Sequence, residues 1–341
     1  GKVLGKPIDL VSADHQGKTD VGANIAGEWF DRKGVDMITD LTFSNVALAV
    51  ENVAKDRKRL TRSTGAGSLA ITNEQCSPYN VHWMYDTYAL ANATATALLA
   101  QGLKTWYFIT ADYAFGHALE KDARAVVTAN GGQVVGGVRH PNNSSDQSSY
   151  LLQAQQSKAQ VIALANAGID TLNTVKTAAE FGIGGSGGQT LAPLLSLITE
   201  IHAMGSKARG MVLTTGFYWD QDQRARQFSM RFYDQHRKMP TMMQAAVYSA
   251  VLTYLKAIEK TGSDDAAAVM ATLRATVIDD AVVRGGRIRD DGRLVHDMML
   301  VQVKEPAAGG TGWDLYDIKR TIPGDQAFQS LAQSRCPLIR K

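Results

Sequence analysis

A short aromatic and acidic segment, TADYAFG at residues 110–116, carries the residue types best suited to holding a small molecule. It follows the apolar run Trp106 to Ile109 and precedes a helix-like run that starts at His117. This pattern predicts a turn at the carboxyl end of a strand, which is the edge of an open α/β sheet where ligands bind. The N–H groups of the following helix also attract anions there. Tyr113 and Phe115 are therefore candidate ligand contacts.

Two further turns carry small hydroxyl residues in the same relation to a strand. Residues 42–44 precede a helix expected from Val46, and residues 63–68 follow a short strand. Backbone N–H groups and hydroxyls at such turns can bind a carboxylate without a basic side chain. Ser44 is equally well explained as an ordinary helix N-cap. The candidate residues are Phe43, Ser44, Gly65, Ala66, Gly67 and Ser68.

Three aromatic groups lie at strand ends or at connections between units of the pattern. They are Trp83 with Tyr85 and Tyr88, Tyr113 with Phe115, and Phe217 with Tyr218 and Trp219. Aromatic side chains are more often core than ligand contacts, but their shared position favours a pocket wall. Such a wall suits an apolar or ring-bearing ligand.

Catalytic and cofactor motifs find little support. The seven histidines are scattered, and neither a P-loop, a GxSxG elbow nor an HExxH motif occurs. Residues 182–187 match GxGxxG, but they follow a helix and precede a strand, which indicates a turn rather than a dinucleotide site. Asp290 and Asp291 are expected to be turn formers. We expect no enzyme activity, no cofactor and no metal.

Length and charge restrict the function classes. A chain of 341 residues accommodates two domains, and a formal charge of +3 without a basic stripe does not suit nucleic acid. No apolar stretch is long enough to span a membrane. No signal peptide is visible, which fits either a cytosolic chain or an exported chain whose signal has been removed.

The two cysteines, Cys76 and Cys336, lack metal-ligand spacing. They are explained either as two buried thiols or as a disulfide, and a disulfide would fit an oxidising compartment. No motif of a catalytic cysteine surrounds either residue.

The hydrophobic pattern alternates between short apolar runs and amphipathic ones, as in parallel sheets built from βαβ units. After Tyr218 it changes to three successive helices. Arg59–Ser63 is unusually polar for a buried parallel strand. The principal expected strands are Ile8–Ala13, Val35–Leu41, Arg59–Ser63, Thr105–Thr110 and Val161–Ala165.

Seven segments together resemble the substrate-binding proteins of branched-chain amino acid-type ABC transporters, which are type I periplasmic binding proteins, and within them the aromatic-acid binders. They are GKPIDLVSADHQGK (5–18), CSPYNVHWMYDTYALANATA (76–95), TADYAFGHALEKD (110–122), ANAGIDTLNTVKTAAEFGI (165–183), FYWD (217–220), PTMMQAAVYSAVLTYLKAI (240–258) and GRIRDDGRLVHDMMLVQVK (286–304).

The resemblance implies an α/β fold of two Rossmann-like lobes with parallel sheets and a ligand cleft between them. Lobe 1 would comprise residues 1–83 and 217–296, and lobe 2 residues 84–216 and 297–341. Three crossover strands are expected near Val81–Asp86, Thr214–Tyr218 and His296–Leu300. The family normally begins with a strand and a helix ahead of GKPIDL, and we expect both to be missing here.

The resemblance also implies roles for the candidate residues. Ser44 and the turn Gly65–Ser68 would hold the ligand carboxylate, and Tyr113 would close over the ligand from lobe 2. The remaining expected contacts are Phe43, Tyr85, Phe115, Asn166, Asp170, Leu194, Phe217 and Tyr218.

The expected ligand class depends on the absence of acidic residues from one segment of lobe 2. Amino-acid-binding members place a carboxylate near the ligand ammonium, but residues 193–199 contain no acid before Glu200. A buried ammonium without a partner is costly. We therefore expect an aromatic carboxylate of the benzoate or phenylpropanoid type, unless Asp170 points into the cleft.

The resemblance thus implies a periplasmic, monomeric receptor that closes by hinge motion and docks an ABC permease in the membrane. Two alternatives stay open: a receptor for branched-chain or other aliphatic amino acids, and the ligand-sensing domain of a regulator.

Overall fold

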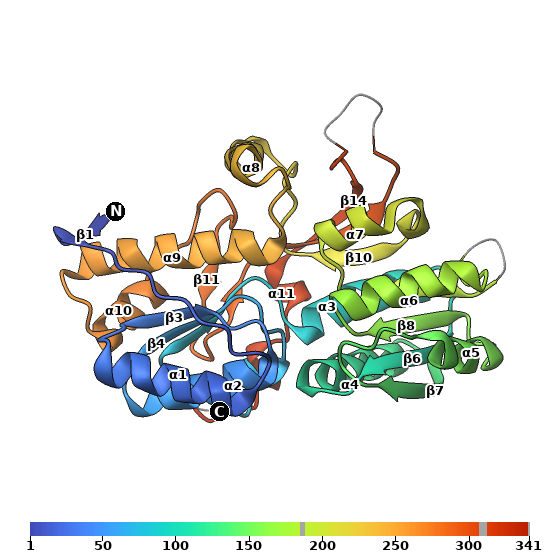
Figure 1. Cartoon of the computed structure of the whole chain (residues 1–341), viewed down its shortest axis with the longest axis horizontal. Helices are drawn as coiled ribbons and strands as arrows, with labels where there is room; N and C mark the ends of the chain where they lie inside the picture. Colours follow the sequence, from blue (N-terminus) through green and yellow to red (C-terminus); the bar gives the residue numbers. More distant parts are fainter. Residues whose placement is uncertain (185–187, 307–311, 340–341) are drawn as a thin grey trace. The chain divides into compact units, whose positions relative to one another are not determined.

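The structure is a computed structural model that describes residues 1–184, 188–306 and 312–339 (Figure 1). The chain divides into two compact units. Unit 1 comprises Gly1–Asp86, Met243–Asp297 and Phe328–Lys341, and unit 2 comprises Thr87–Met242 and Met298–Ala327. The chain therefore passes from one unit to the other at four points, and neither unit is continuous in sequence.

Unit 1 is built on a parallel sheet with the strand order β3–β4–β5. Helices α1 and α2 pack on each other and cover one face of this sheet, and α9 covers the other (Figure 1). Side chains of β4 alternate between the two faces, so Ser63 contacts Glu51 of α2 and Arg62 lies over Tyr254 of α9. The elements named here are α1 (Thr19–Arg32), β3 (Met37–Asp40), α2 (Ser44–Asp56), β4 (Leu60–Ser63), β5 (Asn80–His82) and α9 (Met242–Thr261).

The amphipathic pattern of α2 explains how the unit 1 core forms. Val46, Ala47, Val50 and Ala54 recur at helical spacing and are buried. They join a cluster that includes Phe30 of α1. The smaller elements of unit 1 are β1 (Lys2–Val3), β2 (Lys6–Pro7), the 3₁₀ helix η1 (Leu69–Thr72), α10 (Ala266–Arg274), β11 (Arg287–Ile288), β12 (Leu294–Val295) and the 3₁₀ helix η3 (Leu331–Gln333).

Unit 2 contains a parallel sheet with the order β7–β6–β8–β9, and Figure 1 shows it lying between α4 and α6. An antiparallel sheet of order β10–β13–β14 accompanies it. The elements of the parallel sheet layer are α3 (Thr87–Ala100), β6 (Thr105–Ala111), α4 (Ala114–Ala129), β7 (Gln133–His140), α5 (Ser148–Gln156), β8 (Val161–Ala165), α6 (Ile169–Glu180) and β9 (Thr190–Pro193). The others are α7 (Ile198–Met204), the 3₁₀ helix η2 (Gly205–Ala208), β10 (Val212–Thr215), α8 (Gln223–His236), β13 (Met298–Val303), β14 (Tyr316–Ile322) and α11 (Gly324–Ala327).

The predicted α/β class with parallel sheets is confirmed, and β3, β4, β6 and β8 lie where strands were expected. The strand expected over Ile8–Ala13 is wrong. These residues form no strand, and Leu10 has a fractional exposure of 90%. In the described sheet β3 pairs only with β4, so residues 8–13 make no backbone ladder with it. Of the GxGxxG match, residues 185–187 lie outside the described residues.

The two units differ from the predicted lobes in two longer segments, and also at residues 84–86 and 297, which fall in unit 1. Residues 217–242 belong to unit 2, where Tyr218 and Trp219 contact residues 313–316. Residues 328–341 belong to unit 1, where Phe328 lies over the Arg293 guanidinium. The chain passage expected near Thr214–Tyr218 accordingly comes later, after Met242.

Cys76 and Cys336 form a disulfide within unit 1, with their Cα atoms 5.6 Å apart. Of the two interpretations left open by the sequence, the structure shows the bonded one. Among the described residues, no helix combines the length and apolarity that crossing a membrane requires.

Candidate functional site

In unit 1, Ser44 ties the start of α2 to the loop at residues 64–68. The Ser44 hydroxyl oxygen accepts hydrogen bonds from the backbone N–H groups of Gly67 at 3.3 Å and Ser68 at 3.1 Å. Ser44 is the first residue of α2, and the N-cap is Phe43, whose side chain makes no capping hydrogen bond. The interpretation of Ser44 as the N-cap is therefore wrong. An uncapped helix start beside a fixed loop is a favourable place for an anionic group.

Two more side chains fix the carbonyl groups of this loop. Tyr85 donates its hydroxyl to the carbonyl oxygen of Gly65 at 2.5 Å, and His82 donates from Nε2 to that of Ala66 at 2.8 Å. Burial, together with the nearby Arg293 charge, lowers the pKa of His82 well below its usual value, so the ring is neutral. Neutral His82 therefore donates its Nε2–H to the loop without placing a positive charge beside it.

Close packing makes glycine necessary at position 65. A Cβ atom there would lie 2.9 Å from the Cα of Thr42, a distance at which the backbone would have to shift. The backbone N–H of Gly65 donates to the carbonyl of Asp40, at the end of β3. The loop is therefore held against two neighbouring strand ends and has little freedom to move independently.

In unit 2, the TADYAFG segment forms the predicted turn between β6 and α4. Tyr113 is the N-cap of α4 and makes no side-chain capping bond. A Cβ on Gly116 would lie 2.1 Å from the carbonyl oxygen of Ala111 and 3.0 Å from that of Ala165. Glycine is needed there for α4 to begin against the ends of β6 and β8. The sequence analysis missed this role, although the glycine ending the motif was its signal.

Tyr113 is half-buried, and its ring lies 6.0 Å from that of Phe115 between centroids. Burial raises the pKa of Tyr113, and the negative charge of Asp170 raises it further. The hydroxyl of Tyr113 therefore stays protonated at all physiological pH values and can donate a hydrogen bond.

Asp170 lies in the first turn of α6, just beyond the end of β8, and is buried. Its Oδ2 accepts a hydrogen bond from the backbone N–H of Asn143 at 2.9 Å, whereas its Oδ1 has no partner among the described residues. Burial raises the pKa of Asp170, and the N–H groups of Asn143 and Ser144 and the nearby His140 oppose the shift. Asp170 is thus a buried acid with one oxygen left over.

Asn166 lies at the same sheet edge but has its amide fully engaged. Its Nδ2 lies 3.3 Å from both His140 Nε2 and Thr174 Oγ1, and its Oδ1 accepts the Thr171 hydroxyl at 2.8 Å. His140 in turn donates from Nδ1 to the carbonyl of Pro141. Asn166 therefore supports the β8–α6 turn through contacts inside the protein.

Glu200 also supports a turn. Its Oε2 accepts hydrogen bonds from the Ser196 hydroxyl and the Leu197 backbone N–H, both at 3.0 Å. Burial raises its pKa, and these donors oppose the shift. Leu194, just beyond β9, is buried and donates its backbone N–H to Leu164.

The third aromatic group packs inside unit 2. The Phe217 ring meets Phe228 edge to face, with centroids 6.0 Å apart. Tyr218 donates its hydroxyl to Asp314 at 3.2 Å and packs 5.1 Å from the ring of Tyr316. The polar group of Tyr218 therefore already has a partner.

The predicted residues form two local sets and one separate group. Phe43, Ser44, Gly65–Ser68 and Tyr85 come together in unit 1, and Tyr113, Phe115, Asn166, Asp170 and Leu194 lie at the carboxyl ends of the unit 2 strands. Phe217 packs against Phe228 of α8, and Tyr218 packs against Tyr316 of β14. No group of His, Cys, Asp or Glu in the described ranges is arranged to hold a metal ion.

Comparison with known proteins gives a consistent result. A model of the periplasmic binding protein family matches residues 1–311. A Leu/Ile/Val-binding protein homolog 6 from Brucella melitensis is 30% identical over 196 residues, which is 57% of this chain and 50% of that relative. The matched region thus spans half the length of this curated relative.

Two solved structures resemble the chain over its whole length. A periplasmic binding protein from Burkholderia mallei is 51% identical with a TM-score of 0.96, covering 100% of this chain and 90% of that one. A branched chain amino acid ABC transporter periplasmic ligand-binding protein from Burkholderia xenovorans is 43% identical with a TM-score of 0.86, covering 99% and 90%.

Proposed function

The chain belongs to the periplasmic binding protein family, and from this premise we propose that it is the receptor of an ABC importer for a small carboxylate. Proteins of this family are solute-binding proteins of the transporter type and not enzymes, and they work outside the cytoplasm. The ligand, the membrane permease that it would dock and the monomeric state are parts of the proposal.

One observation supports a carboxylate above all. The uncapped start of α2 lies beside a loop that Ser44, His82 and Tyr85 hold by four hydrogen bonds. A preorganised loop loses little entropy when it binds. The helix dipole and the backbone N–H groups there favour a single negative charge.

In unit 2 the proposal assigns the hydroxyl of Tyr113 to the same ligand, together with the ring of Phe115. Hinge closure, expected from the family resemblance, would follow if ligand binds one arrangement of the units better than the other.

The engagement of Glu200 favours an aromatic carboxylate over an amino acid. Glu200 already accepts two hydrogen bonds near the end of β9. An aromatic acid has no ammonium and needs no acidic partner, and the half-buried ring of Tyr113 offers it an apolar surface.

Branched-chain amino acids are the second candidate. The name of the Burkholderia xenovorans relative refers to them. Asp170 Oδ1, buried and without a partner among the described residues, is the acid that would accept their ammonium group.

Calorimetric titration of one ligand panel separates the two candidates. The panel contains benzoate, 4-hydroxybenzoate, cinnamate, leucine, valine and acetate. We expect one site per chain with micromolar or tighter affinity for an aromatic acid, and that Asp170→Asn leaves this affinity unchanged. Tight leucine binding that Asp170→Asn abolishes would assign the receptor to amino acids instead. If no organic acid in the panel gives a binding signal, the carboxylate proposal itself is refuted.

Tyr113→Ala tests the assignment in unit 2. We expect the affinity to fall about tenfold or more, because a hydrogen bond and a ring contact are lost together. Thermal stability should change little, since the Tyr113 side chain is only half-buried. Tyr233→Ala, at another half-buried tyrosine of unit 2, is the matched control and should leave affinity intact. Unchanged affinity with a large loss of stability would make Tyr113 a core residue.

A further inference from the structure

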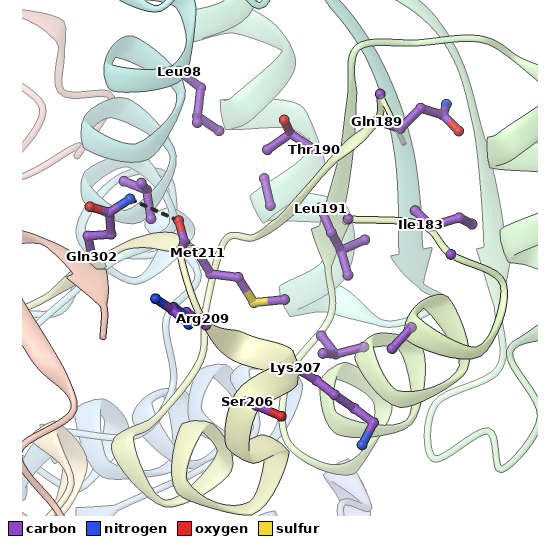
Figure 2. Close-up of a pocket in the computed structure, with 18 of the residues that line it drawn as sticks. Leu98, Ile183, Gln189, Thr190, Leu191, Ser206, Lys207, Arg209, Met211 and Gln302 are labelled. Carbon is purple, nitrogen blue, oxygen red and sulfur yellow. Dashed lines mark hydrogen bonds between the residues drawn. The ribbon is translucent and has the colours of Figure 1, made fainter. Parts of the chain in front are cut away.

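We propose that unit 2 holds a second small-molecule site, for an amphiphilic organic anion, in a cavity at the amino ends of β9 and β10 (Figure 2). The cavity has a volume of about 630 Å³. Ligand pockets typically fall between about 300 and 1,000 Å³, so the space suits a molecule of one or two rings or a medium acyl chain.

This cavity lies at the opposite end of the sheet from the residues assigned to the receptor function. Thr190, the first residue of β9, lines the cavity, whereas Leu194 follows the last residue of the same strand. None of the residues proposed above to bind the transported carboxylate lines it. The second site is therefore independent of the first, and its test does not depend on which solute is transported.

One part of the cavity wall is apolar, and the rest is formed by polar side chains and glycines. Leu98, near the end of α3, and Val175 of α6 approach from two helices, and Leu191 comes from β9. Figure 2 shows Leu98, Ile183, Leu191 and Met211 arranged around the space. These side chains offer a surface that gains free energy when apolar groups cover it.

Two of the three amide side chains at the cavity, Gln302 and Gln189, are already engaged. Gln302 donates to the carbonyl of Gly210 at 3.2 Å, as Figure 2 shows by a dashed line. Gln189 donates to the carbonyls of Ala154 and Ala159. Amides that are bound in this way offer a ligand few free hydrogen-bond donors. Recognition would therefore rest mainly on the shape of the cavity and on one charge.

That charge comes from the rim. Lys207 and Arg209 both line the cavity and are exposed. Arg209 lies 3.9 Å from Glu305, whose negative charge partly neutralises the guanidinium. We therefore assign the anionic head group to Lys207, with the apolar body of the ligand lying on Leu191 and Met211.

The fluorescent sulfonate 1-anilinonaphthalene-8-sulfonate is the probe for this site, titrated into the folded chain. We expect one saturable site. Lys207→Gln should weaken binding about fivefold, as expected for one exposed charge, and its control Lys121→Gln, on α4, should not. Ala179→Trp, which places an indole in the cavity from an exposed position of α6, should abolish binding. Its control Ala129→Trp, at an exposed position of α4, should not.

Three results would overturn the proposal. These are the absence of saturable fluorescence, equal affinity in Ala179→Trp and the unmodified chain, or a loss of dye binding in Ser44→Ala, which would place the dye at the carboxylate site. Near-ultraviolet circular dichroism of each variant establishes that it is folded, so that dye bound to an expanded chain is not counted. Competition by decanoate, with unchanged binding in the presence of benzoate and leucine, would further support an amphiphile site separate from the receptor function.

Discussion

Two internal strands, β4 in unit 1 and β8 in unit 2, are buried throughout and yet have opposite chemistry. In β8 every side chain from Val161 to Ala165 is apolar, whereas β4 reads Leu-Thr-Arg-Ser. Each polar side chain of β4 has a specific contact: Thr61 donates to Asn80 at 3.0 Å, Ser63 donates to Glu51 at 2.5 Å, and Arg62 lies over a ring. The side-chain contacts of β8 are apolar and have no preferred direction. Those of β4 include directional hydrogen bonds, which favour one register.

The difference matters because β4 leads directly into the loop at residues 64–68. A strand positioned by side-chain hydrogen bonds has few alternative arrangements, since each alternative breaks buried hydrogen bonds. We infer that unit 1 depends on its polar contacts for the position of the loop, and that unit 2 depends on packing. The following changes test this inference in order of expected effect.

Asp86→Ala should have the largest effect. Arg293 is fully buried, and its Nη1 lies 3.5 Å from the carboxylate of Asp86. Removing the acid leaves a buried cation without its counterion, which typically costs about 3–5 kcal/mol of unfolding free energy. Urea denaturation measures the loss. Asp31→Ala breaks the exposed ion pair with Arg57 and should change the midpoint far less. Equal effects of the two changes would contradict the dependence of unit 1 on buried charge.

Leu164→Ala should follow, with a loss of about 3–4 kcal/mol. Leu164 is fully buried in β8, and truncation leaves a cavity that the rigid sheet does not fill. The matched control is Leu152→Ala on α5, where the side chain is 45% exposed and the change should stay within about 0.5 kcal/mol. A loss at Leu164 no greater than at Leu152 would show that β8 is not held by packing.

Cys336→Ser should cost about 2–4 kcal/mol, because the bond to Cys76 closes a loop across 260 residues of sequence. Thermal unfolding with and without reductant is the measurement. Reductant should destabilise the unmodified chain by the same amount and should not affect the variant further. If reductant changes both proteins alike, the stabilisation does not come from the disulfide.

Glu51→Gln comes last, because its effect should appear in how stability depends on pH between 4.5 and 8. Burial raises the pKa of Glu51 from 4.5 to about 8, so the folded protein keeps a proton that the unfolded chain has lost. The stability present at low pH is therefore lost as the pH rises towards 8. His82 and His296 act in the opposite sense, because burial lowers their pKa, to about 4 for His296, and they reduce stability as the pH falls below 6.5.

The interval between pH 6.5 and 8 thus separates the contribution of Glu51 from those of the two histidines. There the unmodified chain should lose up to about 2 kcal/mol, and Glu51→Gln should remove this slope. Urea titrations at the two ends of the interval measure it. A slope that persists in Glu51→Gln would have to come from another group.

The same contrast explains what the sequence predicted well. The apolar runs of β6 and β8 identify buried strands directly, and the turn at residues 110–116 follows from the strand before it and the helix after it. Arg59–Ser63 looked too polar for a buried strand because its partners, Glu51 and Asn80, are distant in sequence. A local pattern does not reveal a side chain's partner.

The remaining differences also come from long-range contacts. Tyr218 packs against residues nearly a hundred positions later, so its place in unit 2 was not visible locally. Asn166 was expected to meet ligand, and only the structure shows that His140, Thr171 and Thr174 engage its amide. Ile8–Ala13 has the composition of a strand, but composition does not supply a neighbour.

The interleaving of the two units along the chain has a consequence for folding. All strands of the β6–β9 sheet and the helices that connect them lie within one continuous stretch of sequence, residues 87–204. The β3–β5 sheet needs α9, and Cys76 needs Cys336, both of which come much later in the sequence. Domains fold as units when their residues become available. The β6–β9 sheet can therefore become ordered from local segments, whereas the first unit is completed only when distant segments of the chain come together.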